Sequence, residues 1–241
     1  MFRNGGRGQA LALRPRLAVT LAARSNLSVR LLTAAIGLPL LMVVVWAGGI
    51  VLIGLVAIVA LAAAWEFGKI ATGAGVRLGR PIIAALWLLG GALYIGLPLR
   101  YFIELRVLPD GAAWVFLALL TTFANDTAAY AIGRAAGRHR MAPGISPGKT
   151  WEGAAGGLVA AVVACPLLAM LLGLPEGQWV LLGCGIALAA QAGDLLESML
   201  KRWAGVKDAS ALVPGHGGVL DRLDSLVLVA PLVYHYSQWL T

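Results

Sequence analysis

The sequence predicts an all-α fold, a polytopic transmembrane helical bundle of about seven spans. Three observations support this prediction. Of the 241 residues, 60% are hydrophobic and only 12% are charged, with a mean hydropathy of +0.84. Several apolar runs reach the roughly 17–25 residues needed to cross a bilayer. The basic residues gather in alternate connections between these runs, as in membrane proteins with positively charged cytoplasmic loops.

Each apolar run is expected to be helical, because a backbone in hydrocarbon must satisfy its hydrogen bonds internally. Only Gly48 and Gly49 separate the first two runs, so a turn is expected there. The predicted spans are residues 31–47, 50–68, 81–98, 112–132, 153–173, 177–196 and 223–240.

The placement of Lys and Arg predicts the orientation of the spans. Residues 1–30 contain arginines and no acid, so we place them in the cytoplasm. The opposite side then holds only Arg100 and Arg106 of all 19 basic residues. The net charge of +8 thus indicates topology and attraction to anionic lipid, with no nucleic acid as partner. An organellar presequence or an interfacial helix would also fit residues 1–30.

The first three spans contain almost no ionisable residue apart from Glu66, in the stretch WEFGK. We interpret Glu66 as pairing with Lys69 at the membrane surface, with a functional role as the alternative. The fourth span differs, because FANDTAAYAIGR places Asn125 and Asp126 about two turns from its cytoplasmic end. A carboxylate there is costly unless it faces a partner, a cavity or an ion.

The next connection, GRHRMAPGISPGKTWEGAAGG, is expected to be a tight loop, because its two Pro-Gly pairs exclude a regular helix. Ser146, Lys149 and Thr150 stand directly before the fifth span, where helix N–H groups, a lysine and hydroxyls can bind phosphate. SPGKT resembles the end of a P-loop. That match is rejected because the first glycine is wrongly spaced and no strand is expected before it.

In QAGDLLESMLKRW, the residues Asp194, Glu197 and Lys201 are spaced by three and four, so they share one helix face. A surface salt-bridge ladder is one interpretation, and it stays open for Glu197. For Asp194 a functional role is favoured, because an unpaired charge beside hydrocarbon is costly.

The stretch KDASALVPGHGGVLDRLDS, residues 207–225, gathers charges around three glycines that permit close backbone approach. Asp221 and Asp224 can project from one helix face. Paired carboxylates near Lys and Arg are typical of a divalent metal that holds phosphates. A solvated juxtamembrane loop would explain the basic residues but not the acids. His216 fits either a general base or ligand, or a structural loop residue.

The segment SMLKRWAGVKDASALVPGHGGVLDRLDS, residues 198–225, resembles the signature of the phosphatidate cytidylyltransferases, or CDP-diacylglycerol synthases. NDTAAYAIGR at 125–134, ISPGKTWEG at 145–153 and QAGDLLES at 191–198 agree with the same family. One departure is Val213, where the family usually has Leu, Ile or Phe. The resemblance covers residues 120–230 strongly and the N-terminal half only by its hydrophobic layout.

This resemblance implies an integral membrane enzyme that transfers CMP from CTP to phosphatidic acid, giving CDP-diacylglycerol and pyrophosphate. It implies Mg²⁺ dependence, with a second cation as an option, a homodimer, and a polar catalytic cavity on the cytoplasmic side of, by expectation, a bacterial inner membrane. We accordingly expect a basic cytoplasmic segment over residues 1–30, a transmembrane scaffold over 31–111 and a transmembrane catalytic region over 112–241.

The family's functional residues are carried over by position onto this sequence. The expected catalytic residues are Asp194, Lys201, Lys207, Asp208, Asp221 and Arg222. The expected substrate-binding residues are Asn125, Asp126, Ser146, Lys149, Thr150, Ser198, Arg202, His216, Gly217 and Gly218. The expected metal ligands are Asp194, Asp221 and Asp224.

Two other functions fit parts of the same pattern. A CTP-dependent kinase of a polyprenol or phytol would need a base for its neutral alcohol, and His216 or an aspartate would supply it. A transporter would place polar residues in broken helices near the midplane, whereas here they gather near one surface. The HGG-x-x-DR-x-D pattern at 216–224 favours the cytidylyltransferase.

Overall fold

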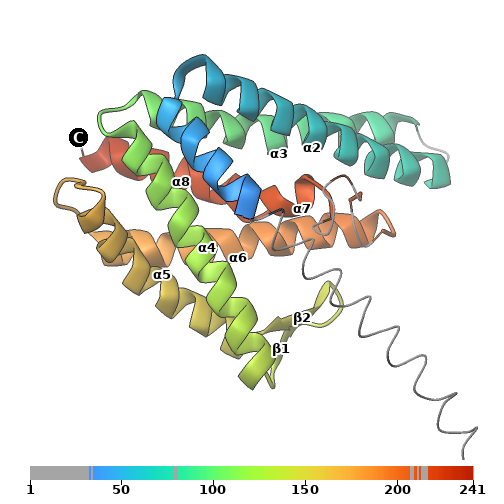
Figure 1. The fold of residues 1–241 in the computed structure, drawn as a ribbon. Coiled ribbons are helices and arrows are strands. Elements are labelled where there is room, and N and C mark those ends of the chain that lie inside the picture. The colour runs from blue at the N-terminus through green and yellow to red at the C-terminus, as the bar shows by residue number, and fades with distance from the viewer. Residues whose placement is uncertain are drawn as a thin grey trace, which may run out of the picture.

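The computed structural model describes residues 33, 35–78, 81–206, 209–210, 212 and 217–240. The predicted segment 1–30 lies outside these residues, as do the site candidates Lys207, Asp208 and His216. Figure 1 shows a bundle of helices with one small β-hairpin. After a first helix, Ala35–Ala47, the elements are α2 (Gly49–Leu78), α3 (Pro81–Val107), α4 (Gly111–Ala136), β1 (Arg140–Ala142), β2 (Ser146–Thr150), α5 (Trp151–Leu171), α6 (Trp179–Trp203), α7 (Leu220–Leu223) and α8 (Leu226–Leu240).

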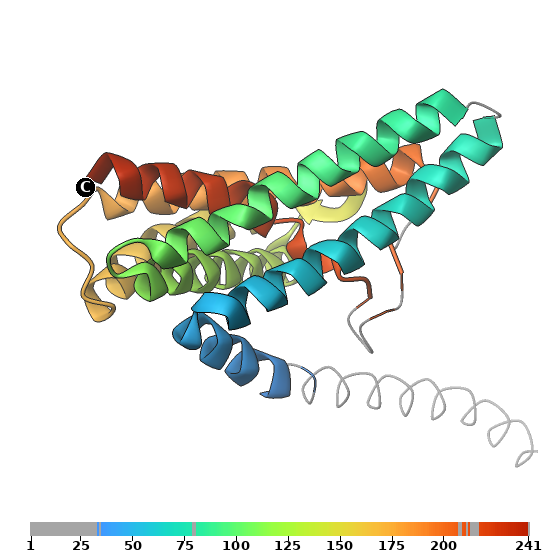
Figure 2. The ribbon, with the colours of Figure 1, turned by 90° about the horizontal axis from the view of Figure 1, so that it is seen from above.

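The predicted all-α membrane bundle is confirmed, and the protein is an integral membrane protein. Among the described residues, five helices are long and apolar enough to cross a membrane, namely Gly49–Ala71, Ala85–Val107, Gly111–Ala136, Trp151–Leu171 and Trp179–Trp203. The predicted first and last spans coincide with shorter helices, Ala35–Ala47 and the 15-residue α8. Figures 1 and 2 show that successive helices run back and forth, so their connections alternate between the two ends of the bundle.

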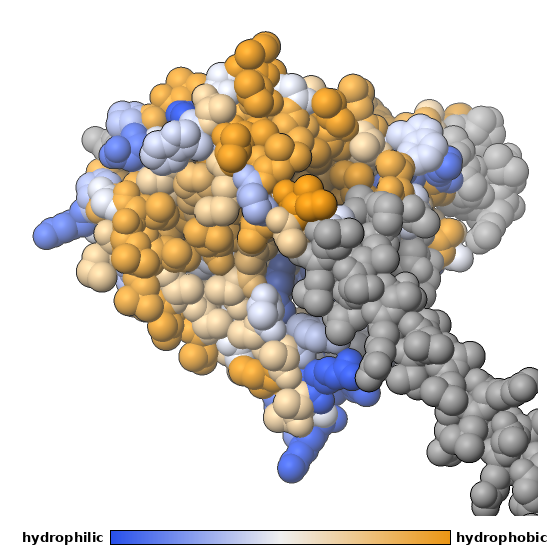
Figure 3. Space-filling model, in the orientation of Figure 1, coloured by the Kyte–Doolittle hydropathy of each residue, from blue (hydrophilic) through white to orange (hydrophobic). Residues whose placement is uncertain are grey.

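The outer surface of the bundle is apolar. Figure 3 shows hydrophobic residues covering most of one face. Ile50, Leu61, Val159, Met170 and Leu188 are all more than half exposed, on the three helices α2, α5 and α6. Contiguous apolar surface of this extent is unfavourable in water, so we assign it to contact with lipid.

A stripe of small residues lets α5 pack closely between α4 and α6. Every fourth residue of α5 is buried along this stripe, which consists of Gly153, Gly157, Ala161, Cys165 and Ala169. A Cβ on Gly153 would lie 2.7 Å from the carbonyl oxygen of Ala129 in α4. A Cβ on Gly183 of α6 would lie 2.7 Å from the carbonyl oxygen of Ala161. Small residues give helices in a membrane the close contact that holds them together.

The turn predicted at Gly48 and Gly49 is confirmed, because both residues have positive φ, at 61° and 51°. Arg106 at the end of α3 stabilises this turn. Its Nε donates to the Val45 carbonyl and its Nη2 to the Trp46 carbonyl, each at 2.8 Å. These carbonyls belong to the last turn of a helix, where acceptors have no helical partner.

Three helices continue well beyond the ends predicted from hydropathy. Helix α2 reaches Leu78 instead of residue 68, α3 reaches Val107 instead of residue 98, and α6 reaches Trp203 instead of residue 196. The added turns carry charges that pair within the helix, such as Arg100 with Glu104 at 3.2 Å. Asp194 consequently lies nine residues before the end of α6, or roughly 14 Å at the helical rise.

The loop predicted between the fourth and fifth spans is an antiparallel hairpin of β1 and β2, with Arg140 opposite Thr150. Its turn contains Pro143 and Gly144, as expected from a non-helical stretch. The hairpin is fixed to α5 by Glu152, whose Oε1 lies 2.6 Å from Nδ1 of His139.

Candidate active site

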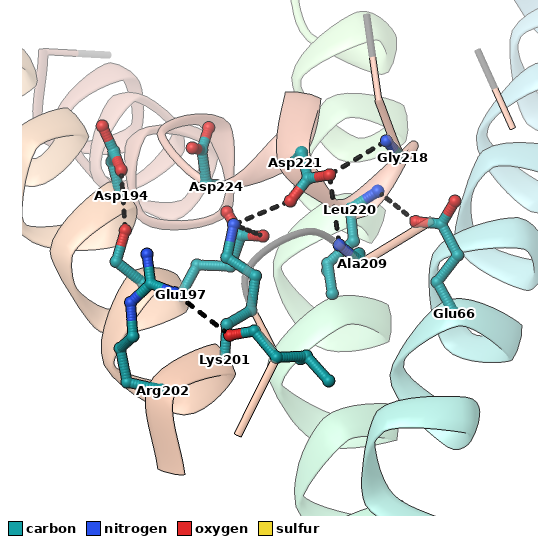
Figure 4. Close-up of polar contacts among 12 residues, drawn as sticks. Glu66, Asp194, Glu197, Lys201, Arg202, Ala209, Gly218, Leu220, Asp221 and Asp224 are labelled. Carbon is teal, nitrogen blue, oxygen red and sulfur yellow. Dashed lines mark hydrogen bonds and ion pairs between the residues drawn. The ribbon is translucent and has the colours of Figure 1, made fainter. Parts of the chain in front are cut away.

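Polar side chains from three parts of the chain meet inside the bundle (Figure 4). Helix α6 contributes Asp194, Glu197 and Lys201 on one face, as their spacing predicts. Asp221 lies in α7, and Asp224 is the first residue after this helix. Glu66 reaches the same region from α2.

Both carboxylate oxygens of Asp221 accept hydrogen bonds. Its Oδ1 accepts a hydrogen bond from Lys201 Nζ at 2.7 Å. Its Oδ2 accepts from the backbone N–H groups of Gly218, at 2.9 Å, and Ala209, at 3.3 Å. Burial raises the pKa of Asp221, but the hydrogen bonds from Lys201 and Gly218 outweigh it and lower the pKa overall. The group is therefore an anion at neutral pH.

Lys201 lies between two carboxylates. Besides Asp221, its Nζ contacts Glu197 Oε1 at 3.0 Å. The Glu197 side chain is only 1% exposed, so the surface salt-bridge ladder considered for it is wrong. One lysine thus contacts a carboxylate of α6 and a carboxylate of α7 and holds the two elements together.

Asp194 is joined to the β-hairpin. Its Oδ2 lies 2.8 Å from Nζ of Lys149, which β2 carries, and its Oδ1 accepts a long hydrogen bond of 3.4 Å from Ser198. The hairpin itself is fastened to α6, because Arg202 Nε donates to the Ile145 carbonyl at 3.1 Å. The loop between α4 and α5 thus delivers a lysine to the acids of α6.

Helix α4 joins the site through Asn125 and Asp126, as expected of polar residues in a span. Asn125 Nδ2 donates to Asp126 Oδ1 at 2.9 Å, and Asp126 Oδ2 accepts from the Ser225 hydroxyl at 3.2 Å. Gln191 of α6 donates to Asn125 Oδ1 at 3.3 Å. The contact to Ser225 places α4 next to the turn that carries Asp224.

Other predicted site residues have structural contacts. The Thr150 hydroxyl accepts from the Gly153 N–H at 3.2 Å and so caps α5. Ser146 pairs with Ala142 in the hairpin. Gly217 has a φ of 85°, a left-handed conformation that favours glycine. Arg222 is exposed on α7. Their roles with a substrate remain predictions.

The main residue that the sequence reasoning missed is Glu66. Its side chain is fully buried within the protein and does not face the membrane surface. Its carboxylate accepts from the N–H groups of Val219, at 3.0 Å, and Leu220, at 2.8 Å. Lys69 lies instead over the ring of Trp65, 3.7 Å from its centroid. A lone acid among three apolar spans was the available signal.

The carboxylates of the three predicted metal ligands do not all point in the same direction. Asp194 and Asp224 point the same way, whereas Asp221 turns toward Gly218 and Lys201 (Figure 4). Within the described part of the chain, no three acidic, histidine or cysteine side chains converge as a metal centre. Mg²⁺ needs only one or two carboxylates when phosphate oxygens and water complete its shell. Asp194 and Asp224 therefore fit Mg²⁺ by donor type and direction.

The close contact between α6 and the α7–α8 turn gives a test of this geometry. A Cβ on Gly193 would lie 2.2 Å from the Asp224 carbonyl oxygen, so Gly193→Ala must displace the turn. A displacement of about 1 Å can lower a rate by up to about 100-fold, and we expect a loss of at least about tenfold.

Gly185→Ala in the same helix is the matched control. Its Cβ would meet only the end of the Leu232 side chain, at 3.1 Å, which can move aside. Equal activity of the two purified variants with CTP and phosphatidic acid, the substrates expected from the sequence, would contradict the proposed close packing at Gly193.

Together the fold and these contacts define the class: a polytopic membrane protein with lysine-paired aspartates gathered between its helices. Residues 82–240 match the model of the cytidylyltransferase family. That match covers more than half of the chain, so this protein belongs to the cytidylyltransferase family.

Similar proteins include the phosphatidate cytidylyltransferase of Bacillus subtilis (strain 168), 41% identical over 146 residues. That alignment covers 59% of this chain and 54% of the relative. The enzyme of the same name from Staphylococcus aureus (strain COL) is 38% identical over 151 residues, covering 62% and 57%. The chain thus aligns with little more than half the length of the curated relatives it matches.

Proposed function

We propose that this protein is a CTP:phosphatidate cytidylyltransferase, which transfers CMP from CTP to phosphatidic acid in phospholipid synthesis. The observation that carries the proposal is a pair of lysine–aspartate ion pairs. Lys149 Nζ lies 2.8 Å from Asp194 Oδ2, and Lys201 Nζ lies 2.7 Å from Asp221 Oδ1. These residues come from three motifs of the family pattern. The relatives named phosphatidate cytidylyltransferase support the choice of substrates.

The reaction joins two anions. An oxygen of the phosphatidic acid phosphate attacks the α-phosphorus of CTP. A new P–O bond forms, the bond from the α-phosphorus to the bridging oxygen breaks, and pyrophosphate leaves. The attacking group is already anionic near neutral pH, since the second pKa of a phosphate monoester is about 6. No strong protein base is required.

The protein's task is then to offset repulsion and to align the groups for in-line attack. Lys149 and Lys201 can move from their aspartates toward phosphate oxygens and stabilise the developing charge. In the unliganded protein, the same pairs keep both aspartates from being unpaired charges among apolar helices.

We propose Mg²⁺ as the cofactor, held by Asp194 and Asp224 with Asp221 beside them, and leave room for a second cation. When bound, Mg²⁺ would polarise the α-phosphate and neutralise part of the triphosphate charge. The orientation of Asp194 and Asp224 supports this assignment.

We further propose that the site faces the cytoplasm of a bacterial cell and that the protein works as a homodimer. The basic residues near the hairpin and the end of α6 support the orientation. The relatives come from bacteria. Acyl chains of the substrate would stay in lipid beside the exposed apolar helices, while CTP enters from water.

The experiment uses the full chain purified in detergent, CTP, and one of three acceptors: phosphatidic acid, diacylglycerol or a polyprenol. We expect CDP-diacylglycerol by mass spectrometry with phosphatidic acid and Mg²⁺, and none when EDTA replaces Mg²⁺. A phosphorylated polyprenol as the product would contradict the proposal and identify a lipid kinase. Product formation in EDTA would contradict the metal assignment alone.

A further inference from the structure

Glu66 connects the N-terminal half of the protein to the candidate active site. Its side chain is fully buried, and it accepts three hydrogen bonds from the C-terminal segment. The donors are the Ser210 hydroxyl and the backbone N–H groups of Val219 and Leu220. These partners lie 144, 153 and 154 residues further along the chain.

The backbone that Glu66 holds leads directly into Asp221. Gly218, one residue before Val219, donates its N–H to Asp221 Oδ2 at 2.9 Å. A Cβ on Gly218 would lie 2.7 Å from Glu66 Oε2, so any larger residue here would have to displace the Glu66 carboxylate. Residues 218–220 are therefore fixed between the carboxylate of Glu66 on one side and that of Asp221 on the other (Figure 4).

We propose that Glu66 is a positioning residue for the reaction: it holds the segment before α7 so that Asp221 faces Lys201, without touching a substrate itself. This inference rests on the function proposed above. Glu66 lies outside residues 82–240, which match the family model. The N-terminal helices would thus take part in forming the site and would not be a passive scaffold.

Glutamine cannot replace Glu66 in this role. Three donors approach the two carboxylate oxygens, and an amide offers only one oxygen. Its NH₂ group would face an N–H or hydroxyl donor, leaving buried groups unpaired. Glu66→Gln nevertheless keeps the volume of the side chain. Glu104→Gln is the matched control, because Glu104 forms a partly exposed ion pair with Arg100 at 3.2 Å near the C-terminal end of α3.

The test measures steady-state transfer of CMP and amide hydrogen exchange of the purified full chain. For Glu66→Gln we expect kcat to fall at least about tenfold, with the KM for CTP changed less than about threefold, as for a misplaced catalytic group. The peptide covering residues 217–223 should exchange faster than in the wild type, because its N–H groups lose their acceptor. Glu104→Gln should resemble the wild type in both measurements.

Ser210→Ala is the second variant, in case Glu66→Gln does not fold. It removes one donor and keeps both backbone hydrogen bonds, so a kcat loss of about two- to threefold is expected. Wild-type kcat and exchange in Glu66→Gln, or in Ser210→Ala if only that variant folds, would overturn the inference. An inactive wild type would refute the proposed function instead. Hydrogen exchange would still test the inference in that case, because unchanged exchange of residues 217–223 in Glu66→Gln would show that Glu66 does not hold this segment.

Discussion

Asp221→Asn is expected to lower CMP transfer by at least about 100-fold, a loss of the size seen when a preorganised electrostatic contact is removed. Both oxygens of Asp221 accept hydrogen bonds, from Lys201 on one and from Gly218 and Ala209 on the other. Asparagine must turn its NH₂ group toward one of these donors. The variant also loses the negative charge that balances Lys201. The measurement is the initial rate with CTP and phosphatidic acid.

Asp110→Asn is the control for this substitution. Asp110 is exposed before α4, with φ of 54° and no side-chain capping hydrogen bond. Asparagine tolerates this left-handed conformation, so activity should stay at the wild-type level. A less than threefold loss in Asp221→Asn would contradict the role of Asp221, given that the control is active.

The second large effect is expected for Lys201→Met. Methionine fills a similar volume but leaves Glu197 and Asp221, 1% and 12% exposed, without their shared cation. Removing one partner of a buried ion pair typically costs about 3–5 kcal/mol of stability. We therefore expect a lower thermal midpoint in detergent together with an activity loss of at least about 100-fold.

A double variant separates the two effects of Lys201→Met. Adding Glu197→Gln removes one uncompensated carboxylate, so part of the thermal stability should return while activity stays low. Lys69→Met changes an exposed lysine that lies over Trp65, and it should leave the rate unchanged. Recovery of activity in the double variant would show that Lys201 acts only as a structural counter-ion.

Much of the architecture could be predicted from the sequence, because hydropathy and length report directly on transfer into a bilayer. The turn at Gly48 and Gly49 followed from two glycines between apolar runs. The end of α6 could not be placed in this way. Glu197 and Lys201 look like the polar end of a span in a hydropathy profile, but they pair with each other inside the bundle, so the helix continues to Trp203.

The sequence predicted most residues of the candidate site, but only some of the contacts between them. The spacing of Asp194, Glu197 and Lys201 indicated one helix face, and the structure confirms it. The contact of Lys149 with Asp194 depends on the hairpin, whose fold required tertiary contacts that no local pattern specifies. The contacts of Glu66 could not be predicted from the sequence, because its partners lie 144 or more residues away. The division into scaffold and catalytic regions at residue 111 stays a prediction.

The central claim is that CMP moves from CTP to phosphatidic acid, and the fate of each CTP phosphate tests it most directly. CTP labelled at either the α- or the γ-phosphate is incubated with Mg²⁺, phosphatidic acid and the wild type or Asp221→Asn. The account predicts α-label in lipid, γ-label only in pyrophosphate, and neither transfer in Asp221→Asn. Label from the γ-phosphate in lipid, or no transfer by a folded wild type, would contradict it.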